Sequence, residues 1–302
     1  ANKDKKDLKI THEKLLELDK NEDLKQIEED WNYIIQKIKD GKRIVIKVGT
    51  STLTYDNGAI NFNRIEKLSM VISDLCNMGK EVVLVSSGAV GIGCGKLRLD
   101  KKPETIKEKQ AAAAVGQCEL MHIYSKFFAE YGHVVAQILL TGIVLDNNEM
   151  KENVCATFET LIKQGIVPIV NENDAISSYE MENVKNFGDN DTLSAIVAKL
   201  VNADTLIILS DIDGFYDKDP RNNSDSKMIK EIHEITKDIE DFAGGAGTNR
   251  GTGGMKTKIS AAKIATSGGT NMVLANGEKP EILLDIIEGK EIGTVFVGKK
   301  EV

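Results

Sequence analysis

The stretch GTGGMKTK at 251–258 places three glycines, two threonines and two lysines within eight residues. Glycine allows backbone N–H groups to turn toward a ligand and allows that ligand to approach the chain closely. Lysine adds a compact positive charge on a flexible side chain. The stretch therefore predicts a phosphate-binding loop, and the alternative is a surface loop that leads into a helix.

Four apolar runs end in, or lead into, small, polar or charged residues that suit phosphate or carboxylate ligands. These residues are Lys47 and Gly49 at RIVIKV (43–48), Ser87 and Gly88 after EVVLVS (81–86), NEND (171–174) after GIVPIV (165–170), and Ser210 and Asp211 at DTLIILS (204–210). A further segment, GDND (188–191), precedes a helical pattern. Taken singly, Lys47 could extend from a strand end into water, and GDND could simply cap a helix. Their coincidence favours one shared site.

Short runs rich in valine and isoleucine alternate with segments of helical length. The runs lie at 43–48, 81–86, 133–140, 165–170, 204–210 and 270–275, and the helical segments at 61–79, 106–131, 147–164, 190–203 and 254–267. Nearly continuous apolar strands separated by helices indicate a parallel sheet that is covered on both faces. We predict an α/β fold, a three-layer αβα sandwich with a mostly parallel central sheet. Ligands of such sheets bind beyond the carboxyl ends of the strands.

The composition of the chain excludes several classes of protein. With 302 residues, 41% hydrophobic residues and a formal net charge of −8, the chain is of globular type and lacks the basic surface that nucleic acid or an anionic membrane needs. No apolar run approaches the ~20 residues of a membrane span, and the N-terminus has no apolar signal core. The four cysteines are far apart and the four histidines form no cluster. We expect a cytoplasmic protein with reduced thiols and no metal site built from histidine or cysteine.

Two familiar nucleotide-binding motifs are missing where they would be expected. Around GAVGIGCGK (88–96) no register satisfies the P-loop pattern, and Lys96 stands where the dinucleotide-binding pattern needs its third glycine. A P-loop ATPase and an NAD-dependent oxidoreductase are therefore disfavoured.

Eight segments resemble, in their order, the amino acid kinase family and within it the branch that acts on glutamate. The segments are KVGTST, VSSGAVGIG, KQAAAAVGQ, QILLT, NENDAI, FGDNDTLSA, LSDIDGFYDKDPR and GTGGMKTK, and the resemblance covers residues 43 to 298 approximately. It implies transfer of the γ-phosphoryl group of ATP to the side-chain carboxylate of L-glutamate, the first step of proline synthesis. Mg²⁺ is expected with the nucleotide, held mainly by phosphate oxygens. A carboxylate is already ionised at neutral pH, so this chemistry requires no general base.

The same resemblance implies a role for individual residues. The catalytic residues would be Lys47, Asp191 and Lys258, with Asp191 holding the two ammonium groups in place. The substrate-binding residues would be Ser87, Gly88, Asp174 and Asn190, with Asp174 near the α-ammonium group and Asn190 at the carboxylate. The ATP-binding residues would be Lys47, Gly49, Ser210, Asp211, Thr252, Gly253, Gly254, Met255, Lys256, Thr257 and Lys258. No protein ligand of a metal is expected.

The resemblance also implies a domain organisation and partners. Residues 41–302 would form the kinase domain, with no C-terminal PUA-type or reductase domain in this chain. Residues 1–40 carry many charges and apolar residues at helical spacing, which predicts a helical extension. It could pack on the body or on another subunit, and the alternative is a solvated helical tail. L-proline as a feedback inhibitor and a homo-oligomer are expected. Ser86 and Ser210 stand where threonine is common in the family.

Three alternatives remain at this point. Another amino acid kinase could act on aspartate, acetylglutamate or a phosphorylated small molecule. A regulatory protein could have kept the fold and lost catalysis, although Lys47, Asp191 and Lys258 are all present. An NAD-binding oxidoreductase is the third, and it lacks the glycine pattern.

Overall fold

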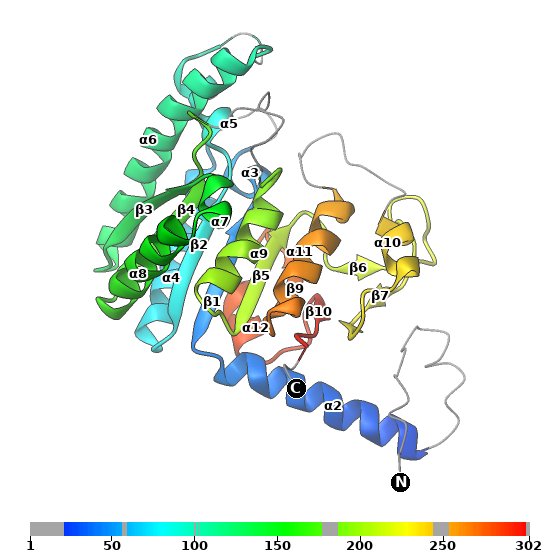
Figure 1. The fold of residues 1–302 in the computed structure, drawn as a ribbon. Coiled ribbons are helices and arrows are strands. Elements are labelled where there is room, and N and C mark those ends of the chain that lie inside the picture. The colour runs from blue at the N-terminus through cyan, green and yellow to red at the C-terminus, as the bar shows by residue number, and fades with distance from the viewer. Residues whose placement is uncertain are drawn as a thin grey trace.

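In this computed structural model the described residues are 21–55, 59–99, 101, 103–176, 187–243 and 254–299. They form an eight-stranded sheet between two layers of helices (Figure 1). The strand order is β3-β4-β2-β1-β5-β9-β10-β8. The six strands of six residues each are β1 (Arg43–Val48), β2 (Glu81–Ser86), β3 (Val135–Leu140), β4 (Val167–Glu172), β5 (Thr205–Ser210) and β9 (Asn271–Asn276).

These six strands are all parallel to one another, so their carboxyl ends meet at one edge of the sheet. At the far side, β10 (Thr294–Phe296) pairs antiparallel with β9, and β8 (Glu231–Ile232) pairs parallel with β10. Strands β6 (Phe215–Tyr216) and β7 (Met228–Ile229) form a separate two-stranded ribbon. The predicted α/β sandwich with a mostly parallel sheet is confirmed.

Two apolar cores lie on the two faces of the sheet. Strand β1 shows how one strand supplies both, because Ile44, Ile46 and Val48 belong to one core and Val45 to the other. The first core is covered by α2 (Asn21–Asp40), α4 (Phe62–Asn77), α6 (Ile106–Glu130) and α12 (Ile282–Ile287). The second is covered by α8 (Asn148–Lys163), α9 (Asn190–Leu200) and α11 (Met255–Ser267). Shorter helices are α3 (Thr50–Leu53), α5 (Ala89–Lys96), α7 (Ile143–Asp146) and α10 (Lys237–Ala243).

Local sequence explains where the longer helices begin. Thr105 and Glu108 form a reciprocal capping box at the start of α6. The side chain of Asn61 accepts a hydrogen bond from the backbone of Arg64 at the start of α4, and Asp189 does the same for Thr192 at the start of α9. The GDND segment is therefore a helix cap, as one reading of the sequence suggested.

The predicted strands and helices differ from the observed ones by a few residues at their ends. The largest strand shift is at β4, which begins two residues late and continues to Glu172 because Asn171 and Glu172 still pair with β3. The short β8 and β10 and the β6–β7 ribbon were not predicted, since two or three residues carry no readable period.

Helix α2 accounts for the second half of the predicted extension, while residues 1–20 lie outside the described part of the chain. Its residues Ile34 and Ile38 are buried in the first core, and Trp31 and Ile35 pack beside them. In Figure 1, α2 crosses beneath the sheet and leads directly into β1. The helix therefore lies at the amino ends of the strands, away from the edge where the predicted site residues gather.

Candidate active site

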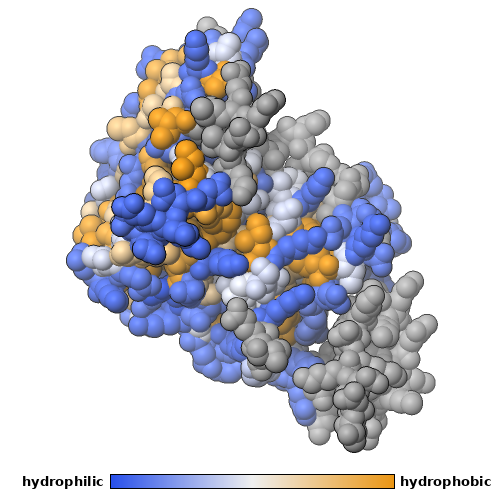
Figure 2. Space-filling model, in the orientation of Figure 1, coloured by the Kyte–Doolittle hydropathy of each residue, from blue (hydrophilic) through white to orange (hydrophobic). Residues whose placement is uncertain are grey.

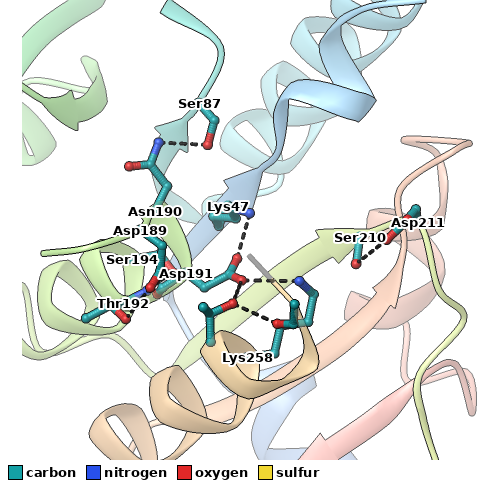
Figure 3. Close-up of polar contacts among 12 residues, drawn as sticks. Lys47, Ser87, Asp189, Asn190, Asp191, Thr192, Ser194, Ser210, Asp211 and Lys258 are labelled. Carbon is teal, nitrogen blue, oxygen red and sulfur yellow. Dashed lines mark hydrogen bonds and ion pairs between the residues drawn. The ribbon is translucent and has the colours of Figure 1, made fainter. Parts of the chain in front are cut away.

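Two buried lysines meet one buried aspartate at the carboxyl edge of the sheet (Figure 3). Lys47 Nζ lies 2.6 Å from Asp191 Oδ1, and Lys258 Nζ lies 3.2 Å from Asp191 Oδ2. The hydroxyl of Thr257 also donates to Asp191 Oδ2, at 2.8 Å. We call Lys47, Asp191 and Lys258 the charge trio. Two ammonium groups and one carboxylate leave it with a net charge of one positive unit.

Three elements from distant parts of the sequence position the trio. Lys47 is the penultimate residue of β1, while Asp191 and Lys258 lie in the first turns of α9 and α11. The positive ends of two helix dipoles therefore point toward this region, where an anion is favoured. Lysine in the first turn of a helix is unfavourable by itself, and the carboxylate of Asp191 offsets that cost.

Burial and charge oppose each other at Asp191. Burial by itself would raise the pKa of this carboxyl group, because the ionised form loses its hydration. The ammonium groups of Lys47 and Lys258 outweigh burial, and they hold the pKa of Asp191 below its ordinary value. The carboxylate is consequently ionised at neutral pH and keeps both lysines in a fixed geometry.

The predicted substrate residues form a wall beside the trio. Asn190 Nδ2 donates to Ser87 Oγ at 2.7 Å, so the end of β2 is linked to the start of α9 (Figure 3). Gly88 adopts a left-handed backbone with φ of +101°, which turns the chain into α5. Asp174 follows β4 and is partly buried, and burial raises the pKa of its carboxyl group.

A cleft of about 320 Å³ opens on the other side of the trio. Lys258, Gly254 and Met255 line it from α11, and Ser210 and Asp211 line it from the end of β5. Its volume is at the lower end of the range for small-molecule sites. Further lining residues that the sequence did not single out are Ile212, Asp213, Tyr216, Pro220, Arg221 and Asn276.

The sequence-predicted residues separate into three groups. The trio, Ser87, Asn190 and the cleft residues come together at one edge of the sheet, with Gly49 following β1 at the same edge. Lys256 lies in the same turn as Lys258 but is exposed. Thr252 and Gly253 lie outside the described residues.

Sequence reasoning missed part of the polar network behind the wall. Asn171 accepts a hydrogen bond from Asn190 and donates one to Gln117 of α6. Asn171 was noted only as a member of NEND, and Gln117 only as the end of KQAAAAVGQ. The signal that could have found Gln117 is a lone amide within the alanine- and glycine-rich run AAAAVGQ.

Among the described residues, no group of three histidine, cysteine or acidic side chains could hold a metal ion. The described helices also include none that is long and apolar enough to cross a membrane.

The family model described as "Amino acid kinase family" matches residues 42–276, a range that includes β1, both lysines of the trio and Asp191. The chain belongs to the amino acid kinase family. It is 74% identical over 263 residues to a glutamate 5-kinase of Clostridium perfringens (strain 13 / Type A), a match that covers 87% of this chain and 98% of that protein. A glutamate 5-kinase of Listeria monocytogenes serovar 1/2a is 58% identical over 266 residues, covering 88% and 96% of the two chains.

Solved structures of the family share the fold at low sequence identity. Carbamate kinase from Giardia lamblia bound to AMP-PNP matches with a TM-score of 0.61 at 16% identity, over 86% of this chain and all of that one. UMP kinase from Bacillus anthracis matches with a TM-score of 0.58 at 16% identity, over 87% and 98% of the two chains. The predicted family is thus confirmed, and the chain is a kinase of this family.

Proposed function

We propose that the protein transfers the γ-phosphoryl group of ATP to the side-chain carboxylate of L-glutamate and forms L-glutamyl 5-phosphate, the first step of proline biosynthesis. The observation that carries the proposal is the charge trio, which holds two cations between a cleft and a polar wall. The high sequence similarity of the chain to glutamate 5-kinases supports glutamate as the acceptor.

Phosphoryl transfer to a carboxylate brings two anions together, so the protein must supply positive charge and alignment. Lys47 would contact the transferred and leaving phosphates from β1, and Lys258 would approach them from α11. Because the lysines are already buried and fixed by Asp191, little reorganisation is needed as charge moves in the transition state. Asp191 would act by positioning the lysines and would not accept a proton.

Glutamate would bind along the wall made by Ser87, Gly88, Asn190 and Asp174. The first backbone N–H groups of α5, which follow Gly88, have no partner within the helix and suit a carboxylate. The carboxylate of Asp174 suits an α-ammonium group, and its burial strengthens that attraction. The α-amino acid head would thereby be fixed while the side-chain carboxylate points toward the trio.

ATP would bind in the cleft lined by Ser210, Asp211 and α11, with Gly49 and the GTGGMKTK segment, including Thr252 and Gly253, near its phosphates. Mg²⁺ would accompany the nucleotide and neutralise charge between the phosphates. It would be held mainly by phosphate oxygens and water, and the carboxylates of Asp211 and Asp213 line the same cleft. Activity should therefore vanish when EDTA is added and return with excess Mg²⁺.

The decisive experiment incubates the purified protein with magnesium–ATP, a candidate acid and hydroxylamine, which converts an acyl phosphate into a hydroxamate. A signal with L-glutamate that is at least tenfold larger than with L-aspartate or N-acetyl-L-glutamate supports the proposal. A larger signal with either alternative acid would reassign the substrate. No signal with any acid, together with measurable ATP binding, would favour a regulatory protein.

We further propose L-proline as a competitive inhibitor, because it shares the α-carboxylate and α-ammonium groups that the wall would hold. Proline should raise the apparent KM for glutamate without lowering kcat at saturating glutamate. A reduced kcat with unchanged KM would place proline elsewhere. We also propose that the protein is cytoplasmic.

We propose that the protein forms a homo-oligomer through the side of the molecule where β3 is the edge strand of the sheet. This edge strand is only partly covered, and Val134 beside it is 62% exposed. Figure 2 shows apolar side chains gathered on this side, over the β3 and α6 region of Figure 1. Light scattering should give a mass that is a multiple of 33.1 kDa. Val134→Glu should lower that mass, and an unchanged oligomer would place the interface elsewhere.

A further inference from the structure

A chain of amide side chains leads from the substrate wall into the interior. Ser87 Oγ accepts from Asn190 Nδ2 at 2.7 Å, and Asn171 Oδ1 accepts from the same Nδ2 at 3.0 Å. Asn171 Nδ2 in turn donates to Gln117 Oε1 at 2.9 Å. We call Ser87, Asn190, Asn171 and Gln117 the amide relay.

Each hydrogen bond of the amide relay determines which end of the neighbouring amide group donates and which end accepts. Asn171 Oδ1 also accepts from the backbone N–H of Glu172 at 2.9 Å, so its oxygen faces two donors. Its NH₂ group donates to Gln117 Oε1, so Gln117 holds the other side of the same amide. Asn171 is 2% exposed and Gln117 is 8% exposed, so water cannot readily substitute for either partner.

This order determines what Asn190 can offer to a substrate. Both hydrogens of its NH₂ group are used, one by Ser87 Oγ and one by Asn171 Oδ1. Within the described part of the chain, its Oδ1 makes no hydrogen bond, and in Figure 3 this oxygen points away from Ser87. A carbonyl oxygen attracts an ammonium group and repels a carboxylate. Conversely, the hydroxyl of Ser87 accepts from Asn190 and keeps its own proton for a carboxylate.

We propose that Gln117 is a positioning residue that sets the polarity of the amide relay, so that Asn190 presents an acceptor to the α-ammonium group of the substrate and Ser87 presents a donor to its α-carboxylate. The inference rests on the proposed function and deepens it, because it assigns the discrimination for α-amino acids to a residue of α6. It also reverses the role that the sequence suggested for Asn190, which was contact with a carboxylate.

Two features show that Gln117 is held in this orientation. The preceding Gly116 packs so closely on α5 that an added Cβ would lie 1.8 Å from the backbone oxygen of Ala89. The backbones of α5 and α6 are therefore in close contact at the residue before Gln117. In addition, Gln117 Nε2 is buried and has no hydrogen-bond partner among the described residues. An unpaired buried N–H is costly, so the orientation is kept by the oxygen's role toward Asn171.

The test compares L-glutamate with glutarate, which has the same five-carbon chain and both carboxylates but lacks the α-ammonium group. In Gln117→Met the buried NH₂ group of Asn171 loses its acceptor, and only the backbone N–H of Glu172 then holds this amide in place. Asn171 can then turn over to pair its NH₂ group elsewhere, Asn190 turns over with it, and selection for the α-ammonium group weakens. We expect the ratio of kcat/KM for glutamate to that for glutarate to fall at least tenfold, with KM for ATP changed less than twofold. Gln117→Glu keeps an oxygen for Asn171 and should retain most of the ratio.

Asn171→Asp is the second variant, in case Gln117→Met does not fold. An aspartate only accepts, so Asn190 stays locked without help from Gln117, and the ratio should be retained. An unchanged ratio in a folded Gln117→Met, an equal loss in Gln117→Glu, or a tenfold loss in Asn171→Asp would overturn the inference. A parent protein that makes no hydroxamate from glutamate would instead refute the proposed function, so the two failures are distinguishable.

Discussion

Lys258 and Asp191 form an ion pair on which both folding and the proposed phosphoryl transfer would depend. Each side chain is more than nine-tenths buried, and a buried charge that loses its partner is left uncompensated. The burial of the two lysines therefore depends on the charge of Asp191. Substitutions in the trio must be chosen so that loss of charge is separated from loss of folding.

For Lys258→Ala we expect kcat to fall by two to three orders of magnitude, roughly the effect of removing one donor from a preorganised site. Lys47 still balances Asp191, so the fold should survive, as circular dichroism can verify. Lys263→Ala is the matched control, because it removes an exposed lysine from the same helix. Near-normal turnover in Lys258→Ala would remove this residue from the catalytic machinery.

Asp174→Asn should raise the stability of the protein and weaken its binding of glutamate. Burial raises the pKa of Asp174, so the folded state binds its proton more tightly than the unfolded state does. Ionisation at neutral pH therefore costs stability, and this cost is absent once the pH falls below the ordinary value of about 3.8.

We expect the asparagine variant to melt about 2 °C higher than the parent at pH 7, with the difference vanishing near pH 3.5. Its KM for glutamate should rise tenfold or more, while its KM for ATP stays unchanged. A lower melting temperature at pH 7 would show that the carboxylate stabilises the fold through a partner.

At the scale of the elements, the contact between α5 and α6 leaves no room for an added side-chain atom. A Cβ on Gly116 or on Gly93 would lie 1.8 Å from a backbone oxygen of the other helix, a distance that only a shift of the helices could relieve. Gly88 is the N-cap residue of α5, so such a shift would move the proposed carboxylate-binding turn.

Gly116→Ala should consequently lower the melting temperature by several degrees and raise KM for glutamate, with a smaller effect on KM for ATP. The matched control is Gly91→Ala, which adds a Cβ to the same helix α5. This Cβ would lie at an ordinary contact distance of 3.5 Å from Thr50 Cγ2. If both variants melt alike, the close approach of the helices is not what limits this region.

The same elements show what the sequence could and could not predict. The long strands and helices are readable because each repeats its apolar pattern over six or more residues, and Lys47, Ser87 and Ser210 were located by their place at strand ends. The pairing of Gln117 with Asn171 joins residues 54 positions apart. It depends on how α6 lies beside the end of β4, and no local pattern encodes it. The role of Asn190 depends on which way one amide faces, and only the hydrogen-bond network determines that.

At the scale of the molecule, the candidate site lies at the carboxyl ends of the strands, and contacts that hold the fold together lie at the amino ends. Asp204 Oδ2 accepts from the backbone N–H groups of Lys42 and Arg43, each at 2.8 Å, and so fixes the start of β1. Helix α2 packs near the same edge through Ile34 and Ile38. We propose that the extension braces the amino ends of the strands and takes no part in catalysis.

Ile38→Ala tests this separation of roles. The side chain is 1% exposed, and truncation of a buried isoleucine costs ~2–5 kcal/mol. We expect a clear loss of melting temperature with both KM values within twofold of the parent. Lys37→Ala, on the exposed side of the same helix, should change neither property. A selective rise in one KM for Ile38→Ala would link α2 to the site.

The charge trio draws its members from points 144 and 67 residues apart along the chain. A nascent or partly unfolded chain that has β1 and α9 but not yet α11 would hold one lysine and one aspartate, a pair with no net charge. If the trio binds phosphate as proposed, such a chain would have little to attract it, and nucleotide would be recruited only after the last of the three segments has docked. Contacts between such distant segments form slowly, because long stretches of chain must be ordered first. The proposed phosphate site would therefore form late in folding, and ATP would stabilise the native state relative to partly folded states.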